Sequence, residues 1–199
     1  MVSTKTQQIK LETGDALIIV DVQNDFLPGG SLAVPEGDAV IAPLNHYMES
    51  FLAKGLPIYA TRDWHPADHC SFREQGGIWP PHCVAGTAGA EFAARLNLPP
   101  GTTIISKATA ADKDAYSGFE GTSLHQQLRK RGVRRLFIGG LATDYCVLNT
   151  VKDALSHHYT ALMLQDAIRA VNVHAGDGRK AEQEMLRLGA IPVTHNTVS

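Results

Sequence analysis

The sequence predicts an α/β fold, a three-layer sandwich in which a mainly parallel β-sheet carries helices on both faces. Two observations lead to this prediction. Short apolar runs alternate along the chain with amphipathic segments of helical period, and these runs lack the polar–apolar alternation of half-exposed strands. With 199 residues, 44% of them hydrophobic and 19% charged, the chain is expected to form a single domain over residues 1–199.

The first half of the chain contains a strand–helix–strand unit. The apolar run 16–20 is followed by Asp21, and its uniform hydrophobicity is typical of a strand buried on both faces. Residues 38–54 carry apolar side chains at helical spacing and are followed by Gly55, a common residue just after a helix. Residues 56–61 form the next expected strand, whose proline lies near its start, where a missing ladder donor is tolerated.

The same alternation continues through the second half of the chain. Strands are expected at 103–106, 136–140, 160–165 and 191–194, and helices at 123–131, 143–157 and 180–188. Ligands of such sheets bind at the carboxyl ends of the strands. This rule directs attention to the residues at four strand ends: Asp21, Asp63, Lys107 and 142–146.

Charge and cysteine content narrow the expected partners and location. Eighteen Lys and Arg against twenty Asp and Glu give a net charge of -2, which makes no electrostatic case for binding nucleic acid or a membrane surface. A small molecule is the better candidate ligand. Three cysteines cannot all pair within one chain and the first residues lack a signal-peptide core, so a cytoplasmic location is expected. The sequence does not determine the oligomeric state and is compatible with a homo-oligomer.

Cys146 is a candidate nucleophile. It lies in GGLATDYCV, after a strand and in the first turn of an expected helix, where free amides and the helix dipole stabilise a thiolate and could hold an oxyanion. Asp21 could accept the thiol proton, and Lys107 would favour the ionised forms of both groups. Alternatively, Cys146 is a small buried hydrophobe, Asp21 a loop acceptor and Lys107 a solvated charge, so the catalytic interpretation requires all three at one edge of the sheet.

A long segment at about 61–100 has no sustained periodicity, and loops of this length are usually functional. It contains four side chains that could bind a metal: Asp63, His65, His69 and His82. One carboxylate and three imidazoles suit a divalent transition metal such as zinc, iron or manganese. Cys70 and Cys83 rank below the histidines that they directly follow, because chain neighbours seldom both face one ion.

Three aromatic residues, Phe26, Trp79 and Tyr116, lie in loops rich in glycine or proline. They could wall a flat aromatic substrate or could pack the loops. A wider pattern connects them with the other candidates. The segments ALIIVDVQNDFLPGGSLAV, ATRDWHPADHCSF, WPPHCVAGTAGAEF, Lys107 with the following DAYSGF, and GLATDYCVLNT together resemble the nicotinamidase/pyrazinamidase family of isochorismatase-like cysteine hydrolases.

The resemblance implies a role for each candidate residue. The family's catalytic triad matches Asp21, Lys107 and Cys146. The family's metal ligands match Asp63, His65 and His82, and His69 lies at a position that often supplies another ligand. The residues of the family's substrate pocket match Phe26, Trp79 and Tyr116. It also implies an oxyanion hole formed by the amides of Ala142 and Cys146, and a cis peptide bond before Ala142. The chain departs from the family at Ala108, where glycine is common.

The activity implied by the resemblance is that of a nicotinamidase, an amidohydrolase that converts nicotinamide to nicotinate and ammonia through a cysteine thioester. Such an enzyme acts in NAD salvage, needs one divalent transition metal and is expected to accept pyrazinamide as well. Two alternatives stay open: another isochorismatase-like amide hydrolase, or a non-catalytic metal- or ligand-binding domain. The sequence does not decide the native metal or the ranking of amide substrates.

Overall fold

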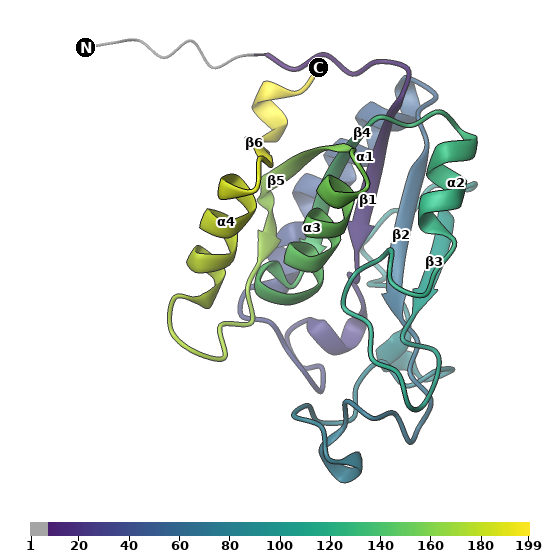
Figure 1. The fold of residues 1–199 in the computed structure, drawn as a ribbon, viewed down its shortest axis with the longest axis vertical. Helices are drawn as coiled ribbons and strands as arrows, with labels where there is room; N and C mark the ends of the chain where they lie inside the picture. The colour runs from purple at the N-terminus through teal and green to yellow at the C-terminus, as the bar shows by residue number, and fades with distance from the viewer. Residues whose placement is uncertain (1–7) are drawn as a thin grey trace.

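The computed structural model describes residues 8–199 and has one six-stranded sheet in the order β3-β2-β1-β4-β5-β6 (Figure 1). The strands are β1 (Asp15–Val20), β2 (Ile58–Asp63), β3 (Thr103–Lys107), β4 (Arg135–Leu141), β5 (Thr160–Arg169) and β6 (Ile191–Val193). All neighbouring strands run parallel. The predicted parallel α/β sheet is therefore confirmed.

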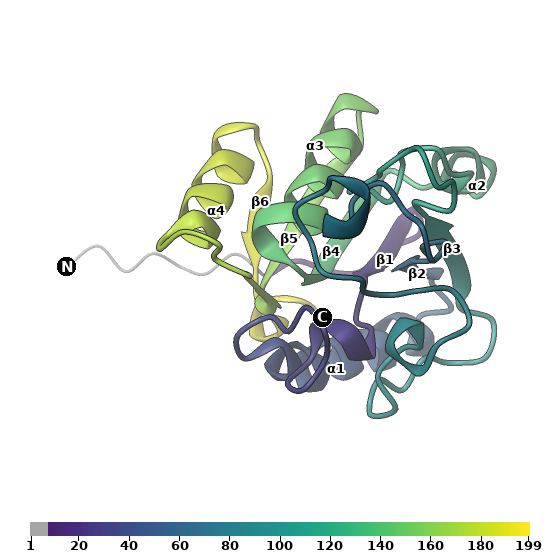
Figure 2. The same ribbon diagram turned by 90° about the horizontal axis from the view of Figure 1, so that it is seen from below.

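Helices cover both faces of this sheet. They are α1 (Ile41–Ala53), α2 (Leu124–Lys130), α3 (Leu148–Ser156) and α4 (Asp177–Arg187). Helix α1 lies on one face, and α2, α3 and α4 lie on the other (Figure 2). Alternate residues of β1 enter the two resulting cores: Leu17 packs in the core on the α1 side, and Ile18 packs in the core formed with the other helices. The three-layer prediction is confirmed as well.

The ends of β1 and β4 lie unusually close together. Val20 pairs with Gly140, and a Cβ atom on Gly140 would overlap the backbone of Val20. Gly140 also has φ +128°, a conformation that other residues rarely adopt. Because no other residue fits there, glycine at this position lets the segments that follow β1 and β4 lie side by side.

Most element boundaries differ from the expected ones by one to three residues, and two segments differ in a way that affects the carboxyl edge of the sheet. Strand β5 continues to Arg169 instead of ending near residue 165, which carries the chain toward the carboxyl edge of the sheet. The expected helix at 143–157 begins with a π-helical turn, Thr143–Val147, before α3. A single π-helical turn of five residues is too short for its period to be distinguished from that of an α-helix in the sequence.

The long segment after β2 lies beyond the carboxyl ends of the strands, in the lower part of Figure 1. It contains only short 3-10 turns, Arg73–Gln75 and Ala88–Ala90.

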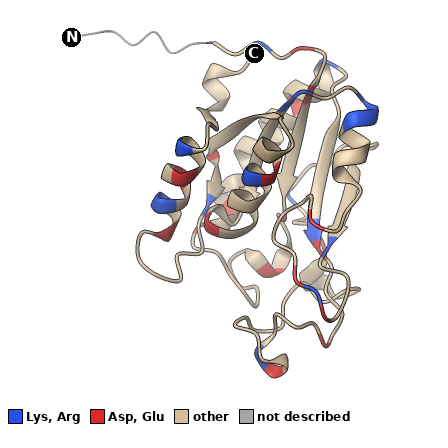
Figure 3. Cartoon of the chain, viewed as in Figure 1, with Lys and Arg blue, Asp and Glu red and all other residues tan. Residues whose placement is uncertain are grey.

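Charged side chains of both signs alternate along the exposed face of α4 (Figure 3), where Lys180 pairs with Asp177. Within residues 8–199, no helix has the length and apolar character required to cross a membrane.

Candidate active site

The strand order brings four chain positions to one edge of the sheet. Asp21 directly follows β1, Asp63 ends β2, Lys107 ends β3 and Cys146 lies in the turn after β4. Asp63 and Lys107 are partners in the ladder between β2 and β3. The structure therefore places the side chains of Asp21, Lys107 and Cys146 together, although long stretches of sequence separate them.

Lys107 lies at the centre of this group and is only 1% exposed. Its Nζ is 3.0 Å from Asp21 Oδ2, forms an ion pair with Asp63 Oδ1, and donates to Cys146 Sγ at 3.4 Å and to the Ala115 carbonyl at 3.2 Å. Burial opposes the charge, but the carboxylates of Asp21 and Asp63 hold the pKa of Lys107 well above its ordinary value. Lys107 is therefore a buried ammonium between two carboxylates.

Asp21 is buried and has one oxygen without a hydrogen-bond donor. The Thr61 hydroxyl donates to Oδ1 at 2.6 Å, whereas Oδ2 is 3.0 Å from Lys107 Nζ and has no assigned hydrogen-bond donor among residues 8–199. Burial raises the pKa of Asp21 above its ordinary value, although Lys107 opposes this shift. A carboxylate in this environment is a stronger base than one in water.

Cys146 lies in the π-helical turn and is almost fully buried. Burial raises the pKa of its thiol well above the ordinary value, and the charges of Asp21 and Asp63 add to the shift while Lys107 opposes it. The resting side chain is therefore a neutral thiol. The sequence argument for a stabilised thiolate relied on the free amides, the helix dipole and Lys107, and it did not include the effect of burial and of the neighbouring carboxylates on the pKa of the thiol.

The backbone around Cys146 has free amides. The Leu141–Ala142 peptide bond is cis, as the family resemblance implied. The Ala142 carbonyl accepts hydrogen bonds from the amides of Tyr145 and Val147. Within residues 8–199, the amides of Ala142 and Cys146 donate to no backbone carbonyl outside the π-helical turn, so both are candidates to bind a carbonyl oxygen placed near Sγ.

Asp63, His65 and His82, called the metal group below, have ligand atoms within 4.8 Å of one another, and all three side chains are buried. His65 Nδ1 donates to the Ala108 carbonyl at 3.2 Å and His82 Nδ1 to the Pro80 carbonyl at 2.8 Å, which leaves both Nε2 lone pairs free. His65 Nε2 is buried 3.6 Å from Asp63 Oδ2 and has no hydrogen-bond partner in the described part of the chain.

The ionisation of the metal group also suits a metal ion. Burial lowers the pKa of His82, which favours the neutral imidazole that metals bind. Burial works against the Asp63 carboxylate, yet Lys107 and His65 hold the pKa of Asp63 below its ordinary value. One carboxylate and two imidazoles, each with Nε2 left free by the hydrogen bond at Nδ1, fit a divalent transition metal.

His69 lies beside the metal group, but its nitrogens are engaged elsewhere. Its ring centroid is 4.2 Å from that of His65, while Nε2 donates to the Lys113 carbonyl at 3.2 Å and Nδ1 accepts from Ser71 Oγ at 2.8 Å. In this arrangement no lone pair is available for an ion. His69 therefore lies next to the metal group without belonging to it, and its role as a fourth ligand stays a prediction. Cys70 and Cys83 do not belong to the metal group either.

Ala108 has a left-handed backbone with φ +50°, which accounts for the glycine that is common at this position in the family. We expect Ala108→Val to destabilise the fold by about 2 kcal/mol, because β-branched residues are strained in this conformation. The same change should weaken metal binding, since the Ala108 carbonyl orients His65. Thermal unfolding and zinc titration measure the two effects; Ala108→Gly is the control, and equal stability of both variants would contradict the argument.

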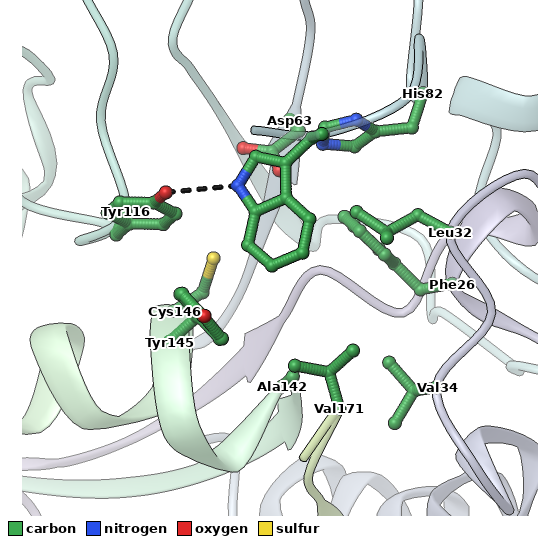
Figure 4. Close-up of a pocket in the computed structure, with 11 residues that line it drawn as sticks. Phe26, Leu32, Val34, Asp63, His82, Tyr116, Ala142, Tyr145, Cys146 and Val171 are labelled. Carbon is green, nitrogen blue, oxygen red and sulfur yellow. Dashed lines mark hydrogen bonds between the residues drawn. The ribbon is translucent and has the colours of Figure 1, made fainter. Parts of the chain in front are cut away.

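A small cavity opens onto these groups (Figure 4). Its lining residues are Phe26, Leu32, Val34, Asp63, Trp79, His82, Tyr116, Ala142, Tyr145, Cys146 and Val171. All three aromatic residues singled out from the sequence line it. The Trp79 indole donates to the Tyr116 hydroxyl at 3.1 Å, and the Tyr145 ring packs 5.0 Å from that of Trp79. The cavity is thus flanked by aromatic rings.

Several contributing residues were missed at the sequence level. Leu32, Val34, Tyr145 and Val171 complete the cavity wall. Gln23 is fully buried and fixes the backbone of Asp63, since its side-chain oxygen accepts from the Asp63 amide at 2.8 Å and its amide group donates to the Asp63 carbonyl at 2.8 Å. Gln23 and Tyr145 lie inside the motif segments and could have been considered, whereas no local pattern marks Val171.

Comparison with known proteins agrees with this geometry. Residues 15–197 match the isochorismatase domain family. The nicotinamidase of Escherichia coli (strain K12) is 37% identical over 196 residues, covering 88% of this chain and 92% of that protein. The structure of the pyrazinamidase of Pyrococcus horikoshii in complex with zinc superposes with a TM-score of 0.87 at 51% identity, covering 91% and 99% of the two chains.

A structure from L. infantum in complex with nicotinate also has a TM-score of 0.87, at 34% identity, with 97% of this chain and 98% of that chain covered. These relatives share the fold along nearly their full length, and the family match includes every strand of the sheet. On this evidence, the chain belongs to the isochorismatase family.

Proposed function

We propose that this protein is a nicotinamidase that hydrolyses nicotinamide to nicotinate and ammonia, and that also accepts pyrazinamide. One observation carries the proposal: Cys146, beside the Asp21–Lys107 ion pair, lines the same aromatic-walled cavity as Asp63 and His82 of the metal group. A small aromatic ring that carries a nitrogen atom and a carboxamide suits such a cavity, because the ring nitrogen can face the metal group while the carboxamide faces Cys146. The E. coli nicotinamidase, the zinc-bound pyrazinamidase and the nicotinate complex support the same assignment.

The first half-reaction forms a thioester. Asp21 accepts the proton of the Cys146 thiol, and the thiolate attacks the carboxamide carbon. The amides of Ala142 and Cys146 donate to the oxyanion that develops on the carboxamide oxygen. The C–N bond then breaks, Asp21 returns its proton to the leaving nitrogen, and ammonia departs from the acylated cysteine.

The second half-reaction restores the enzyme. A water molecule attacks the thioester carbonyl while Asp21 accepts its proton, and the same amides stabilise the second oxyanion. The C–S bond breaks, the proton passes from Asp21 to Cys146 Sγ, and nicotinate is released. Lys107 keeps its charge throughout and stabilises whichever of Asp21 or Cys146 is anionic.

Asp63, His65 and His82 would hold one divalent transition metal: zinc, iron or manganese. When bound, the ion supplies a Lewis-acid site for the ring nitrogen of the substrate and so orients the ring. The residues of the chain carry out the acyl transfer itself. We place the reaction in the cytoplasm and in NAD salvage; the three free cysteines agree with a reducing compartment.

The test is ammonia release by the purified, metal-replete protein from nicotinamide, pyrazinamide and benzamide. We expect rapid release from the first two and little from benzamide, which lacks the ring nitrogen. A folded, metal-replete protein that releases no ammonia from nicotinamide would refute the proposal. It would direct attention to other carboxamides and then to a non-catalytic binding domain.

Metal removal tests the orienting role of the ion. Chelation is expected to lower kcat/KM for nicotinamide by about 100-fold, because the ring loses its anchor and the metal group loses its counter-charge. It should also lower Tm, since an ion that binds only the folded state stabilises it. His82→Ala is the matched control, because its Tm should not respond to chelation. Unchanged kinetics after verified metal loss would contradict the assigned role.

A further inference from the structure

We infer that Asp144 is a positioning residue that fixes the apolar wall of the substrate cavity by holding the backbone beneath Val171. The inference rests on the proposed nicotinamidase function and adds a determinant of substrate shape to it. Asp144 does not line the cavity itself, so it acts through the segment that it holds.

The contact is a two-oxygen clamp on successive amides. Asp144 Oδ1 accepts from the Val171 amide at 2.9 Å, and Oδ2 accepts from the Asn172 amide at 2.8 Å. Asn172 has a left-handed backbone with φ +51°, which turns the two N–H groups toward one anion as in a backbone nest. Because Asp144 lies two residues before Cys146 in the same π-helical turn, the clamp couples the wall to the thiol.

The far side of the segment is tied to α4. The Gly178 amide donates to Asn172 Oδ1 at 2.9 Å, and a Cβ atom on Gly178 would overlap the Ala170 methyl group. Residues 170–172 are thus held between the turn that carries Cys146 and the start of α4. The hydrogen bonds of Asp144 attach residues 170–172 to the turn that carries Cys146, whereas the Asn172–Gly178 hydrogen bond attaches them to α4.

Val171 lies beside Ala142 and Val34 in the cavity, on the side away from Asp63 and His82 (Figure 4). A substrate whose ring nitrogen faces the metal group presents the opposite side of its ring to this wall. The position of Val171 therefore decides how much space a ring substituent has. A 5-methyl group is adjacent to neither the ring nitrogen nor the carboxamide, so 5-methylnicotinamide probes this space without disturbing either anchor.

The experiment compares kcat and KM for nicotinamide and 5-methylnicotinamide in the metal-loaded wild type, Asp144→Asn, Val171→Ala and the double variant. Asparagine keeps the size of Asp144 but offers one acceptor oxygen to two N–H donors. We expect each single variant to lower the preference for nicotinamide over its methyl derivative by about 10-fold, with kcat for nicotinamide changing less than KM. In the double variant the effects should not add, because both act through Val171.

Asp177→Asn is the matched control, because Asp177 also accepts a backbone amide hydrogen bond, from His174 at 2.9 Å, but within residues 8–199 its side chain has no hydrogen bond to residues 170–172. It should leave the preference unchanged. An equal loss of kcat for both substrates in Asp144→Asn, with the preference intact, would overturn the inference. Full additivity of the two effects in the double variant would also overturn the inference. A Val171→Ala variant that keeps the wild-type preference would overturn it too, and this outcome can be measured even if Asp144→Asn does not fold.

Amide hydrogen exchange separates this inference from the function on which it rests. Faster exchange at Val171 and Asn172 in Asp144→Asn, with protection of β4 retained, would support the clamp whether or not nicotinamide is the substrate. Unchanged exchange at both amides would overturn it. Absence of ammonia release from nicotinamide by the wild type would refute the proposed function alone.

Discussion

Replacing Cys146 by alanine is expected to lower kcat for nicotinamide by about 10⁴-fold or more, because no other group near the cavity can form the proposed thioester. The neighbouring acid and base would remain. Asp21 keeps its ion pair with Lys107, and the free amides of the turn keep their positions. The remaining activity would come only from substrate orientation and oxyanion binding, which cannot replace a covalent intermediate.

The measurement is ammonia release at saturating nicotinamide, with metal content and Tm determined on the same preparations. Cys70→Ala is the control, since this free cysteine lies outside the cavity and is expected to keep wild-type activity. Mass spectrometry of quenched wild type should detect the acylated cysteine. Substantial turnover by a metal-replete Cys146→Ala variant would show that the metal group, and not the thiol, supplies the nucleophile.

Replacing Lys107 by methionine is expected to abolish measurable turnover and to destabilise the protein by about 3–5 kcal/mol. Methionine fills a similar volume without a charge. The change would leave the carboxylates of Asp21 and Asp63 buried near each other without the ammonium that both contact. Asp21 would then bind a proton permanently and could no longer accept one from Cys146.

Thermal and denaturant unfolding measure the loss of stability, which should be larger after chelation because a bound ion compensates the charge of Asp63. Lys180→Met is the matched control: this lysine is exposed and pairs with Asp177 on the surface of α4, so its loss should change stability by less than about 0.5 kcal/mol. Lys107→Met with wild-type stability in both metal states would contradict the described charge balance.

The sequence alone was sufficient for the fold and for most of the cavity. The apolar run at β1 and the helical spacing of apolar residues at α1 indicate which faces of these elements are buried. Parallel strands place their carboxyl ends at one edge of the sheet. The grouping of Asp21, Lys107 and Cys146 was predictable for that reason. Asp21 directly follows β1, Lys107 ends β3 and Cys146 lies just beyond β4, whereas the order of these strands in the sheet came from the structure.

Only the tertiary structure decided how individual atoms are used. His69 belongs to the sequence motif, yet its nitrogens bond Ser71 and the Lys113 carbonyl, the latter 44 residues away. The raised pKa of Cys146 depends on burial and on charges from other strands. Val171 reaches the cavity because Asp144 holds its amide. The periodicity of the sequence indicates which face of an element is buried. In contrast, the hydrogen-bond partners of a side chain and its pKa depend on residues that are distant in the sequence.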